Sequence, residues 1–426
     1  MAELAIKGGE PLRKKPFPPW PQWGEEEVEG LKEVLESRRW YSGPRGGSPG
    51  TKVEAFGRAF ADFCGVRHGV ILPNGSISLE VALRALGVGP GDEVIVPAYT
   101  FISTGTSPLM VNAIPVVVDI EPETYCLDPE GVEAAITERT RAIIVVHLGG
   151  QMADMDRLLP LARAHGLPLL EDAAQAIGSV WRGQRAGSLG RIASFSFQAN
   201  KVITSGEGGA LVTDDGELAE LCTSLRSFGR REMEAEEATR LSAYESFILS
   251  SNYRVSEFQG AVLLAQLARF PRHQERREKN ARYLTGRLMD VPGVEHVRGD
   301  GRAEIHGYYY YIMRYDPEAW AGVGRDEFIR AMRAEGIPLH PGEERPIHRH
   351  SVFLKENCRP RGCPLSCPYY GREVNIYGGH HPVAERACRE SLILRHEVLL
   401  GERQDMDDIV DAMLKLHSHL DELRSH

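Results

Sequence analysis

The sequence has little of what marks a membrane-bound, secreted or nucleic-acid-binding protein. Its longest apolar runs, such as 142–146, are strand-sized and far shorter than the roughly 20 residues that span a membrane. The first residues, MAELAIKGGEPLRKKPFPPWP, contain no apolar core of the kind that a signal peptide has. The net charge is -10, and no basic patch is interleaved with aromatic residues. These absences argue against binding to nucleic acid or to anionic lipid.

Paired cysteine motifs are also lacking. The seven cysteines are scattered through 426 residues, and their odd number is typical of reduced thiols in the cytoplasm. Four cysteines and two histidines gather in the C-terminal part: Cys358, Cys363, Cys367, Cys388, His380 and His381. Their spacing lacks the C-x-x-C pairs of zinc sites. We therefore expect a cytoplasmic protein without a metal site.

The first two thirds of the chain alternate between strand-like and helix-like segments. Most of the strand-like runs are continuously apolar, as expected for strands covered on both faces. They are 66–72, 92–98, 114–120, 141–148, 167–172, 193–197 and 210–213. Helical segments, such as 76–87 and 155–166, lie between them. This alternation predicts an α/β domain with a mostly parallel sheet.

The pattern changes after about residue 270. A long charged helix is predicted over 272–290, followed by a tyrosine-rich strand over 308–315 and helices over 325–336 and 405–416. We expect a large domain over 1–270, including an N-terminal arm, and a smaller C-terminal α/β domain over 271–426. One face of the run of tyrosines, Tyr308 to Tyr311, could border a pocket.

Asn74, Gly75 and Ser76 stand between a predicted strand and a predicted helix. A helix N-terminus offers free N–H groups and the positive end of a dipole, which suits a phosphate. Gly75 allows close approach, and Ser76 could donate its hydroxyl. The alternative is an ordinary capped helix, with Ser76 as the N-cap.

Asp172 lies at the end of the strand-like run LPLLED, with Gln175 three residues further on. Ligands of open α/β sheets bind beyond the carboxyl ends of the strands, so this carboxylate is a candidate site residue. The alternative is an aspartate that caps a helix.

Lys201 stands between the strand-like ASFSF and the turn-forming TSGEGG. An amine held in a tight turn beyond a strand suits covalent binding of a carbonyl group. The alternative is a solvated lysine. A glycine-rich stretch at 42–50 follows no predicted strand and is expected to be a loop rather than a dinucleotide-binding motif.

These three features, taken together, favour pyridoxal 5′-phosphate (PLP). A phosphate seat, a strand-end aspartate and a turn lysine follow one another along one α/β domain. The aspartate would keep the pyridine nitrogen protonated, and the lysine would hold the aldehyde as an imine and carry the proton.

The sequence also resembles the DegT/StrS-type aminotransferases of amino-sugar and aminocyclitol biosynthesis over nearly its whole length. The resemblance runs through GGEPLRKKPFPPWP, GPGDEVIVPAYTFIST, EDAAQAIGS, SFSFQANKVITSGEGGALVT and NYRVSEFQGAVLLAQL. It implies PLP-dependent fold type I, as in aspartate aminotransferase, with a large and a small domain. A regulator or scaffold with this fold is disfavoured, because every cofactor position carries a competent residue type.

The resemblance implies a role for each matching position. Lys201 would be the imine lysine and Asp172 the partner of the pyridine nitrogen. The remaining residues would bind other parts of the cofactor: Gln175 its ring hydroxyl, Phe101 its ring face, and Gly75, Ser76 and Ser196 its phosphate. Asn252 would reach the phosphate from a neighbouring subunit, which implies a homodimer with shared active sites.

The stretch around Lys201 also suggests the substrate. Its Thr204-Ser205-Gly206-Glu207 segment resembles the enzymes that aminate keto-inositols such as scyllo-inosose, and the aminohydroxybenzoate synthases. We expect a keto-cyclitol as the acceptor and glutamine or glutamate as the donor. The alternatives are a nucleotide-linked keto-sugar aminotransferase and a dehydrating enzyme of the aminohydroxybenzoate-synthase kind.

Overall fold

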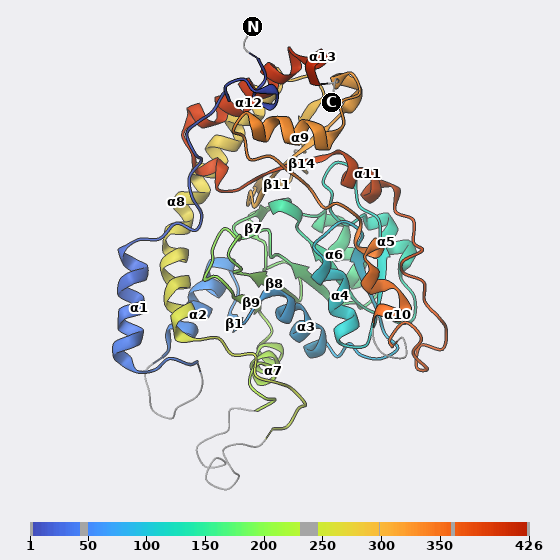
Figure 1. Cartoon of the computed structure of the whole chain (residues 1–426). Helices are drawn as coiled ribbons and strands as arrows, with labels where there is room; N and C mark the ends of the chain where they lie inside the picture. Colours follow the sequence, from blue (N-terminus) through green and yellow to red (C-terminus); the bar gives the residue numbers. More distant parts are fainter. Residues whose placement is uncertain (1–2, 43–49, 231–245, 298, 359–362, 424–426) are drawn as a thin grey trace.

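The chain folds into a large and a small α/β part that share one long helix (Figure 1). The structure is a computed structural model that describes residues 3–42, 50–230, 246–297, 299–358 and 363–423. Both termini lie on the side of the small part. Apart from its two ends, the glycine-rich stretch 42–50 lies outside the described residues.

A seven-stranded sheet forms the centre of the large part. Its strands, in spatial order, are β1 (His68–Leu72), β9 (Gly209–Thr213), β8 (Ile192–Ser196), β5 (Leu169–Asp172), β4 (Thr140–Val146), β2 (Glu93–Pro97) and β3 (Ile114–Val118). Only β9 runs against its neighbours, and the other pairings in the sheet are parallel. The seven strands coincide with the seven predicted runs, and the expected mostly parallel sheet is confirmed.

Alternate side chains of the central strands face two separate hydrophobic clusters. In β4, for example, Ile143 and Val145 belong to one cluster, whereas Ala142 and Ile144 belong to the other. A strand buried on both faces has no position left for polar side chains, which explains the continuous apolar runs. The first cluster is covered by α2 (Lys52–Cys64), α5 (Pro129–Ala135), α6 (Met155–Ala164) and α8 (Glu257–Leu288), and the second by α3 (Gly75–Ala85), α4 (Ile102–Met110) and α7 (Gly216–Arg226).

The small part is a four-stranded antiparallel sheet with helices packed against it. Its strands are β10 (Val294–His296), β12 (Tyr310–Tyr315), β14 (Ser391–Arg395) and β13 (His340–Pro341), and its main helices are α9 (Arg325–Ala334) and α12 (Arg403–His417). Their apolar faces share one core with Leu4 of the N-terminal arm. The tyrosine-rich strand predicted over 308–315 begins two residues later, at Tyr310. Tyr308 has a φ of 46°, which lies outside the β region.

Helix α8 belongs to both parts. Leu263 and Phe270 pack in the core of the large part, and Leu284 and Leu288 pack in the core of the small part. The helix predicted over 272–290 is thus the second half of a helix of 32 residues. A domain boundary after residue 270 falls within this helix, and the division 1–270 and 271–426 remains a proposal.

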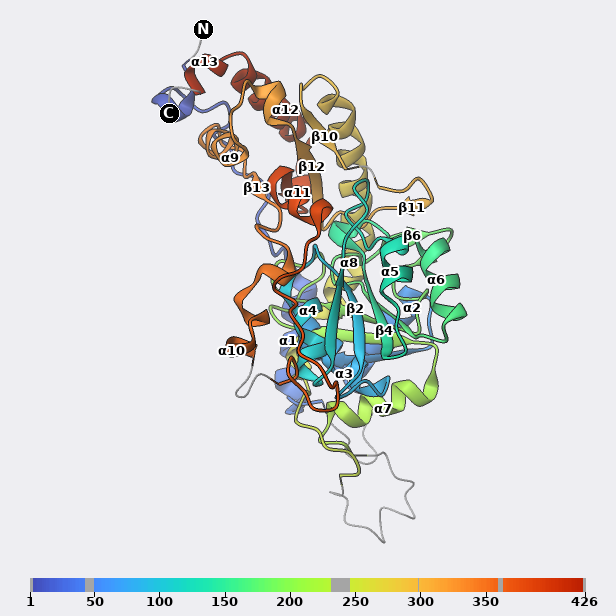
Figure 2. The ribbon, with the colours of Figure 1, turned by 90° about the vertical axis from the view of Figure 1, so that its right-hand side faces the viewer.

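The chain also returns from the small part to the large one. After β13 it runs down to α10 (Lys355–Cys358), beside α4, before it climbs to α11 (Pro382–Glu390) (Figure 2). On the way Ile347, Phe353 and Leu365 pack in the core beside α3 and α4. The remaining short elements are η1 (Ala5–Lys7), α1 (Glu25–Ser37), η2 (Leu148–Gly150), η3 (Pro317–Trp320), η4 (Ile347–Arg349), η5 (Ser351–Phe353), η7 (Val398–Leu400) and α13 (Leu420–Leu423).

Among the helices that the structure describes, none has both the length and the apolar character that a membrane span requires.

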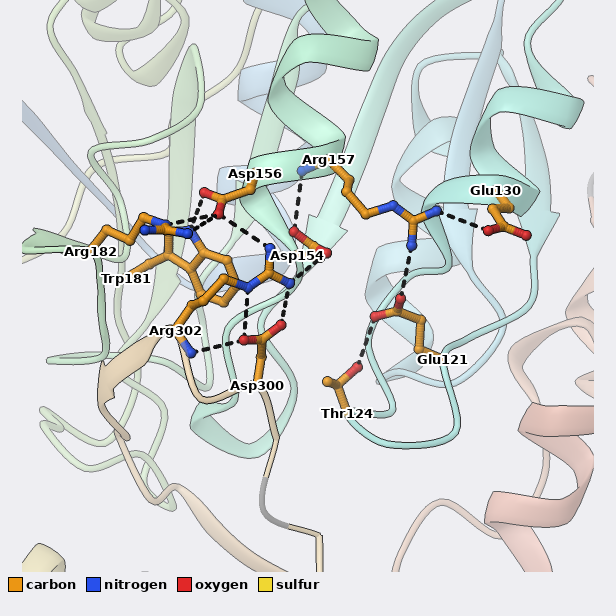
Figure 3. Close-up of polar contacts among 10 residues, drawn as sticks. All are labelled: Glu121, Thr124, Glu130, Asp154, Asp156, Arg157, Trp181, Arg182, Asp300 and Arg302. Carbon is orange, nitrogen blue, oxygen red and sulfur yellow. Dashed lines mark hydrogen bonds and ion pairs between the residues drawn. The ribbon is translucent and has the colours of Figure 1, made fainter.

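An ion-pair cluster joins the two parts at a third, smaller sheet of β11 (Ala303–Ile305), β6 (Val180–Trp181) and β7 (Gln184–Arg185). The Arg302 guanidinium lies 2.7 Å from the Asp154 carboxylate and 3.2 Å from that of Asp156 (Figure 3). It also pairs with Asp300 and lies 4.8 Å from the ring centre of Trp181. Hydrogen bonding to Asp300 and Asp154 raises the pKa of Arg302, and the bond from Arg302 lowers that of Asp300.

Replacing Arg302 should loosen this junction. We expect Arg302→Gln to lower the free energy of unfolding by about 1–2 kcal/mol, because several charge-assisted hydrogen bonds are lost at a half-buried position. Since the folded-state pKa of Asp300 is lowered, the contribution is present at neutral pH and is lost as the pH falls below about 4. Urea unfolding of the parent and the variant measures the difference. Arg330→Gln, which removes an exposed ion pair within one helix, is the control, and equal effects of the two variants would contradict the role of the cluster.

Candidate active site

Several of the predicted site residues lie at the carboxyl ends of the parallel strands. Asp172 is the last residue of β5 and Ser196 the last residue of β8, and these strands are neighbours in the sheet. Gly75, the first residue of α3, follows β1 by a short turn. In a parallel sheet these ends meet at one edge, so residues distant in sequence face a common space.

Asp172 is a buried carboxylate with two hydrogen-bond donors. The Thr104 hydroxyl donates to Oδ2 at 2.8 Å and the Ala174 N–H donates to Oδ1 at 3.3 Å. Burial raises the pKa of Asp172, while the bond from Thr104 and the charge of Lys201 act in the opposite direction. The side chain caps a turn, and no helix among the described residues begins there, which rules out the helix-cap alternative. The donors and the charge around Asp172 therefore do not fully offset the cost of burying its carboxylate.

A second buried pair supports this strand end from the other face. The backbone N–H of Ala153 donates to His147 Nδ1 at 3.2 Å, so Nε2 carries the proton and donates to Glu171 Oε2 at 3.0 Å. Glu171 also accepts bonds from the backbone N–H groups of 187, 189 and 190. Although burial opposes it, the bonds from His147 and these N–H groups hold the pKa of Glu171 below its usual value. This network fixes the neighbour of Asp172 and the adjoining loop.

The start of α3 lies close against the end of β8. A side chain at Gly75 would place its Cβ 2.9 Å from the Cβ of Ser196, so only glycine fits. The N-cap is Asn74, whose side chain accepts from the Ile77 N–H at 2.8 Å, and not Ser76. Ser76 is exposed and its hydroxyl lies 2.6 Å from that of Ser103 on α4. The start of α3 thus lies against the end of β8, and the hydroxyls of Ser76 and Ser103 meet beside it.

Gln175 and Phe101 border the same edge of the sheet. The Gly149 N–H donates to Gln175 Oε1 at 2.7 Å, which directs the amide NH2 group away from that backbone. Phe101 is the N-cap residue of α4, which carries Thr104, and 56% of its surface is exposed. An aromatic ring so exposed, at the start of the helix whose Thr104 bonds to Asp172, is available to a flat ligand.

Lys201 is held in a closed turn beyond β8. Its N–H donates to the Gln198 carbonyl at 2.8 Å, and the turn is closed by the bond from the Ser205 N–H to the Phe197 carbonyl at 3.2 Å. The Nζ atom lies 4.1 Å from the ring centre of Tyr309, just before β12. Within the described residues no carboxylate forms an ion pair with Nζ, so the amine is not committed to a salt bridge.

Asn252 lies apart from the other candidates. It is exposed, bridges to Ser227 after α7, and its Oδ1 accepts from the Arg254 N–H at 3.2 Å. In the part of the chain that the structure describes, it contacts none of the other predicted site residues. Its predicted role concerns a second subunit.

The sequence did not single out Thr104 or His147. Thr104 was detectable in part, as a threonine one helical turn after Thr100 at a helix start. His147 was not, because its bonds to Ala153 and Glu171 depend on how neighbouring strands pack.

The cysteines and histidines of the C-terminal part do not form a cluster. Cys358 Sγ contacts the Cys363 carbonyl at 3.6 Å, and Cys388 is buried in the large core. Among the described residues no group of three or more potential ligands is placed to hold a metal ion.

This architecture and site define the class of the protein. The mostly parallel sheet and the smaller α/β part have the architecture of fold type I, which structural neighbours at 36% and 30% identity share. The chain belongs to the DegT/DnrJ/EryC1/StrS aminotransferase family, whose model matches residues 21–391. The resemblance found in the sequence is thereby confirmed, and the protein is an aminotransferase.

Named relatives cover nearly the whole chain. A Streptoalloteichus tenebrarius protein, provisionally named L-glutamine:3-amino-2,3-dideoxy-scyllo-inosose aminotransferase, is 42% identical over 99% of this chain and 100% of its own length. L-glutamine:2-deoxy-scyllo-inosose aminotransferase of Streptomyces paromomycinus is 40% identical over 98% of both chains. The crystal structure of 3-amino-5-hydroxybenzoic acid synthase has a TM-score of 0.81 at 36% identity and covers 95% of this chain and 100% of that chain.

Replacing Asp172 should separate stability from activity. Because burial raises the pKa of Asp172, the ionised carboxylate lowers the stability of the folded protein relative to the unfolded chain, and removing the charge should not destabilise the protein. We expect Asp172→Asn without ligands to melt within about 2 °C of the parent or higher, and to lose more than tenfold in kcat, or about 1.4 kcal/mol of barrier. Thermal unfolding and steady-state rates measure both. A loss below tenfold would contradict the predicted role.

Proposed function

We propose that this protein is a cytoplasmic, PLP-dependent aminotransferase that transfers the amino group of glutamine or glutamate to the ring ketone of a cyclitol of the scyllo-inosose type. The observation that carries the proposal is the convergence of Asp172, Lys201 and the start of α3 at one edge of the sheet. The named relatives support the choice of donor and acceptor.

The residues present fit the cofactor. The space left by Gly75 and the N–H groups at the start of α3 suit a phosphate, together with Ser76 and Ser196. Asp172, buried and short of positive charge, suits a protonated pyridine nitrogen. The directed amide of Gln175 suits a ring hydroxyl, and the exposed ring of Phe101 suits the flat face. When bound, PLP supplies an electron sink for the carbon that exchanges its amino group.

The chain's own residues then do three things. Lys201 Nζ binds the cofactor and accepts or returns a proton at the reacting carbon. The Tyr309 ring, 4.1 Å from Nζ, holds the end of the lysine side chain in place through a cation–π contact. Asp172 would pair with the pyridine nitrogen of the cofactor and favour its protonation, and Thr104 orients the carboxylate through its 2.8 Å bond.

We further propose a homodimer that shares its active sites. Large apolar side chains are exposed on the face of α1 and beyond α7: Trp23 is 74% exposed, Leu35 53% and Leu249 89%. Side chains of this size favour burial in an interface. Asn252 is exposed and follows Leu249 by three residues. From this surface it could reach the phosphate seat of a second subunit.

The substrate is tested with a panel of acceptors. We expect the PLP-loaded protein with glutamine to aminate scyllo-inosose and its deoxy derivatives with a kcat/KM at least tenfold above that for a nucleotide-linked 4-keto sugar, and to release no dehydrated aromatic product. Product analysis by mass spectrometry measures each outcome. Lys201→Ala, which should fold but not turn over, is the control. A preference for the nucleotide-linked sugar, or an aromatic product, would replace the proposal with one of its two rivals.

The shared active site is tested by mixing subunits. Lys201→Ala and Asn252→Ala should each be inactive as pure dimers, whereas a mixed dimer contains one site with neither change. We expect up to a quarter of the parent's activity to return once subunits have exchanged, because statistical mixing makes about half of the dimers hybrid. Exchange is followed separately with differently tagged subunits. Complete exchange without any recovered activity would rule out a role for Asn252 across the interface.

A further inference from the structure

Arg277 is a fully buried cation on the inner face of α8. The residue is 0% exposed, and within the described residues none of its three guanidinium nitrogens has a hydrogen-bond partner. Burial lowers the pKa of Arg277 to about 9, so the side chain is still charged at neutral pH. Buried charges in proteins are normally paired, because an isolated ion loses the stabilisation that water gives it. The function proposed above does not use Arg277.

Aromatic rings from three parts of the chain lie around this guanidinium. Its central carbon lies 5.2 Å from the ring centre of Phe270, two turns earlier on α8, so the side chain is directed back along the helix. At that level of α8 the His273 ring lies 6.2 Å from the ring of Trp20 in the N-terminal arm. The Trp20 ring in turn lies 4.5 Å from that of His396 in the small part. The Phe270 ring attracts the cation but supplies no negative charge.

His396 adds a second buried nitrogen to the same place. Its Nε2 donates to the Asn200 carbonyl at 3.0 Å, whereas its Nδ1 has no hydrogen-bond partner among the described residues. Burial and the charges of Arg277, His273 and Lys201 lower the pKa of His396, which shows that cations dominate its surroundings. Glu278, the next residue after Arg277, stands about 100° further round the helix and forms no hydrogen bond with it. This region therefore lacks a negative charge.

We propose that Arg277 and His396 border a buried binding site for a small monovalent inorganic anion of the size of chloride. One uncompensated positive charge requires one negative charge, and a single anion accepts several charge-assisted N–H bonds at once. A position this buried suits a small ion that stays in place rather than a substrate that exchanges. The bound anion joins α8 to the small part and, through the bond of His396 to Asn200, to the turn before Lys201.

The anion site is tested by the dependence of stability on chloride. The protein is saturated with PLP, so that the proposed phosphate seat is not free to take the halide, and is melted in potassium chloride and in potassium gluconate of equal ionic strength. We expect chloride to raise the Tm of the parent by about 2 °C or more, with a rise that saturates as its concentration increases. Arg277→Met should not respond to chloride. In gluconate it should melt at or above the Tm of the parent, because it removes an unpaired buried charge.

Arg272→Met is the matched control, because it removes an exposed positive charge from the same helix and should keep the full response to chloride. A parent without a saturable response, or an equal response in Arg277→Met, would overturn the inference. So would an Arg277→Met protein that melts well below the parent in gluconate, because the guanidinium would then be satisfied without an anion. None of these outcomes bears on the proposed aminotransferase activity, since the measurement involves no turnover.

A diffraction experiment with bromide locates the ion directly and does not depend on the folding of any variant. Crystals of the PLP-loaded parent are soaked in sodium bromide, and data are collected at the bromine absorption edge. We expect an anomalous peak in contact with the Arg277 guanidinium. Bromide peaks at other positions only, with none at Arg277, would overturn the inference.

Discussion

The burial of the Asp172 carboxylate is the constraint on which the site depends. An anion at the end of an apolar strand is disfavoured unless positive charge or donors surround it. The fold supplies a hydroxyl from Thr104 and one backbone N–H, which is less than the carboxylate needs. Because the carboxylate needs a further positive partner, this strand end suits a cationic ring nitrogen. The neighbouring His147–Glu171 pair holds the strand end in place.

The reactive lysine depends on more of the chain than its own turn. The Trp20 indole N–H of the N-terminal arm donates to the Ala199 carbonyl at 3.0 Å. His396, just after β14, lies 3.0 Å from the Asn200 carbonyl and packs edge-on against Trp20. The arm, the central sheet and the small part therefore meet at the residues that precede Lys201. The position of Lys201 therefore depends on how the arm, the central sheet and the small part pack together.

Much of this arrangement could be predicted from the sequence, because the signals were local. The seven central strands followed from continuous apolar runs, since both of their faces are buried. Asp172, Lys201 and Gly75 could be found because each stands where a strand gives way to a turn or a helix. Asn74 rather than Ser76 caps α3, because the helix begins two residues earlier than a cap at Ser76 would imply. One face of the run from Tyr308 to Tyr311 was expected to border a pocket, but which tyrosine contacts Lys201 could not be predicted, because the approach of Tyr309 depends on how the small part packs. The first half of α8 was missed because its boundary lies within an ordinary amphipathic pattern.

Helix α8 runs without interruption from the core of the large part into the core of the small part. At about 1.5 Å per residue, the stretch from Pro271 to Leu288 is roughly 26 Å long, and Pro271 lies inside the helix, where the backbone lacks a hydrogen bond and bends most easily. A bend of about 5° there moves the far end by about 2 Å, the difference between a hydrogen bond and a gap. A small change in the curvature of this helix would therefore alter the distance between the sheet edge and the far end of the small part.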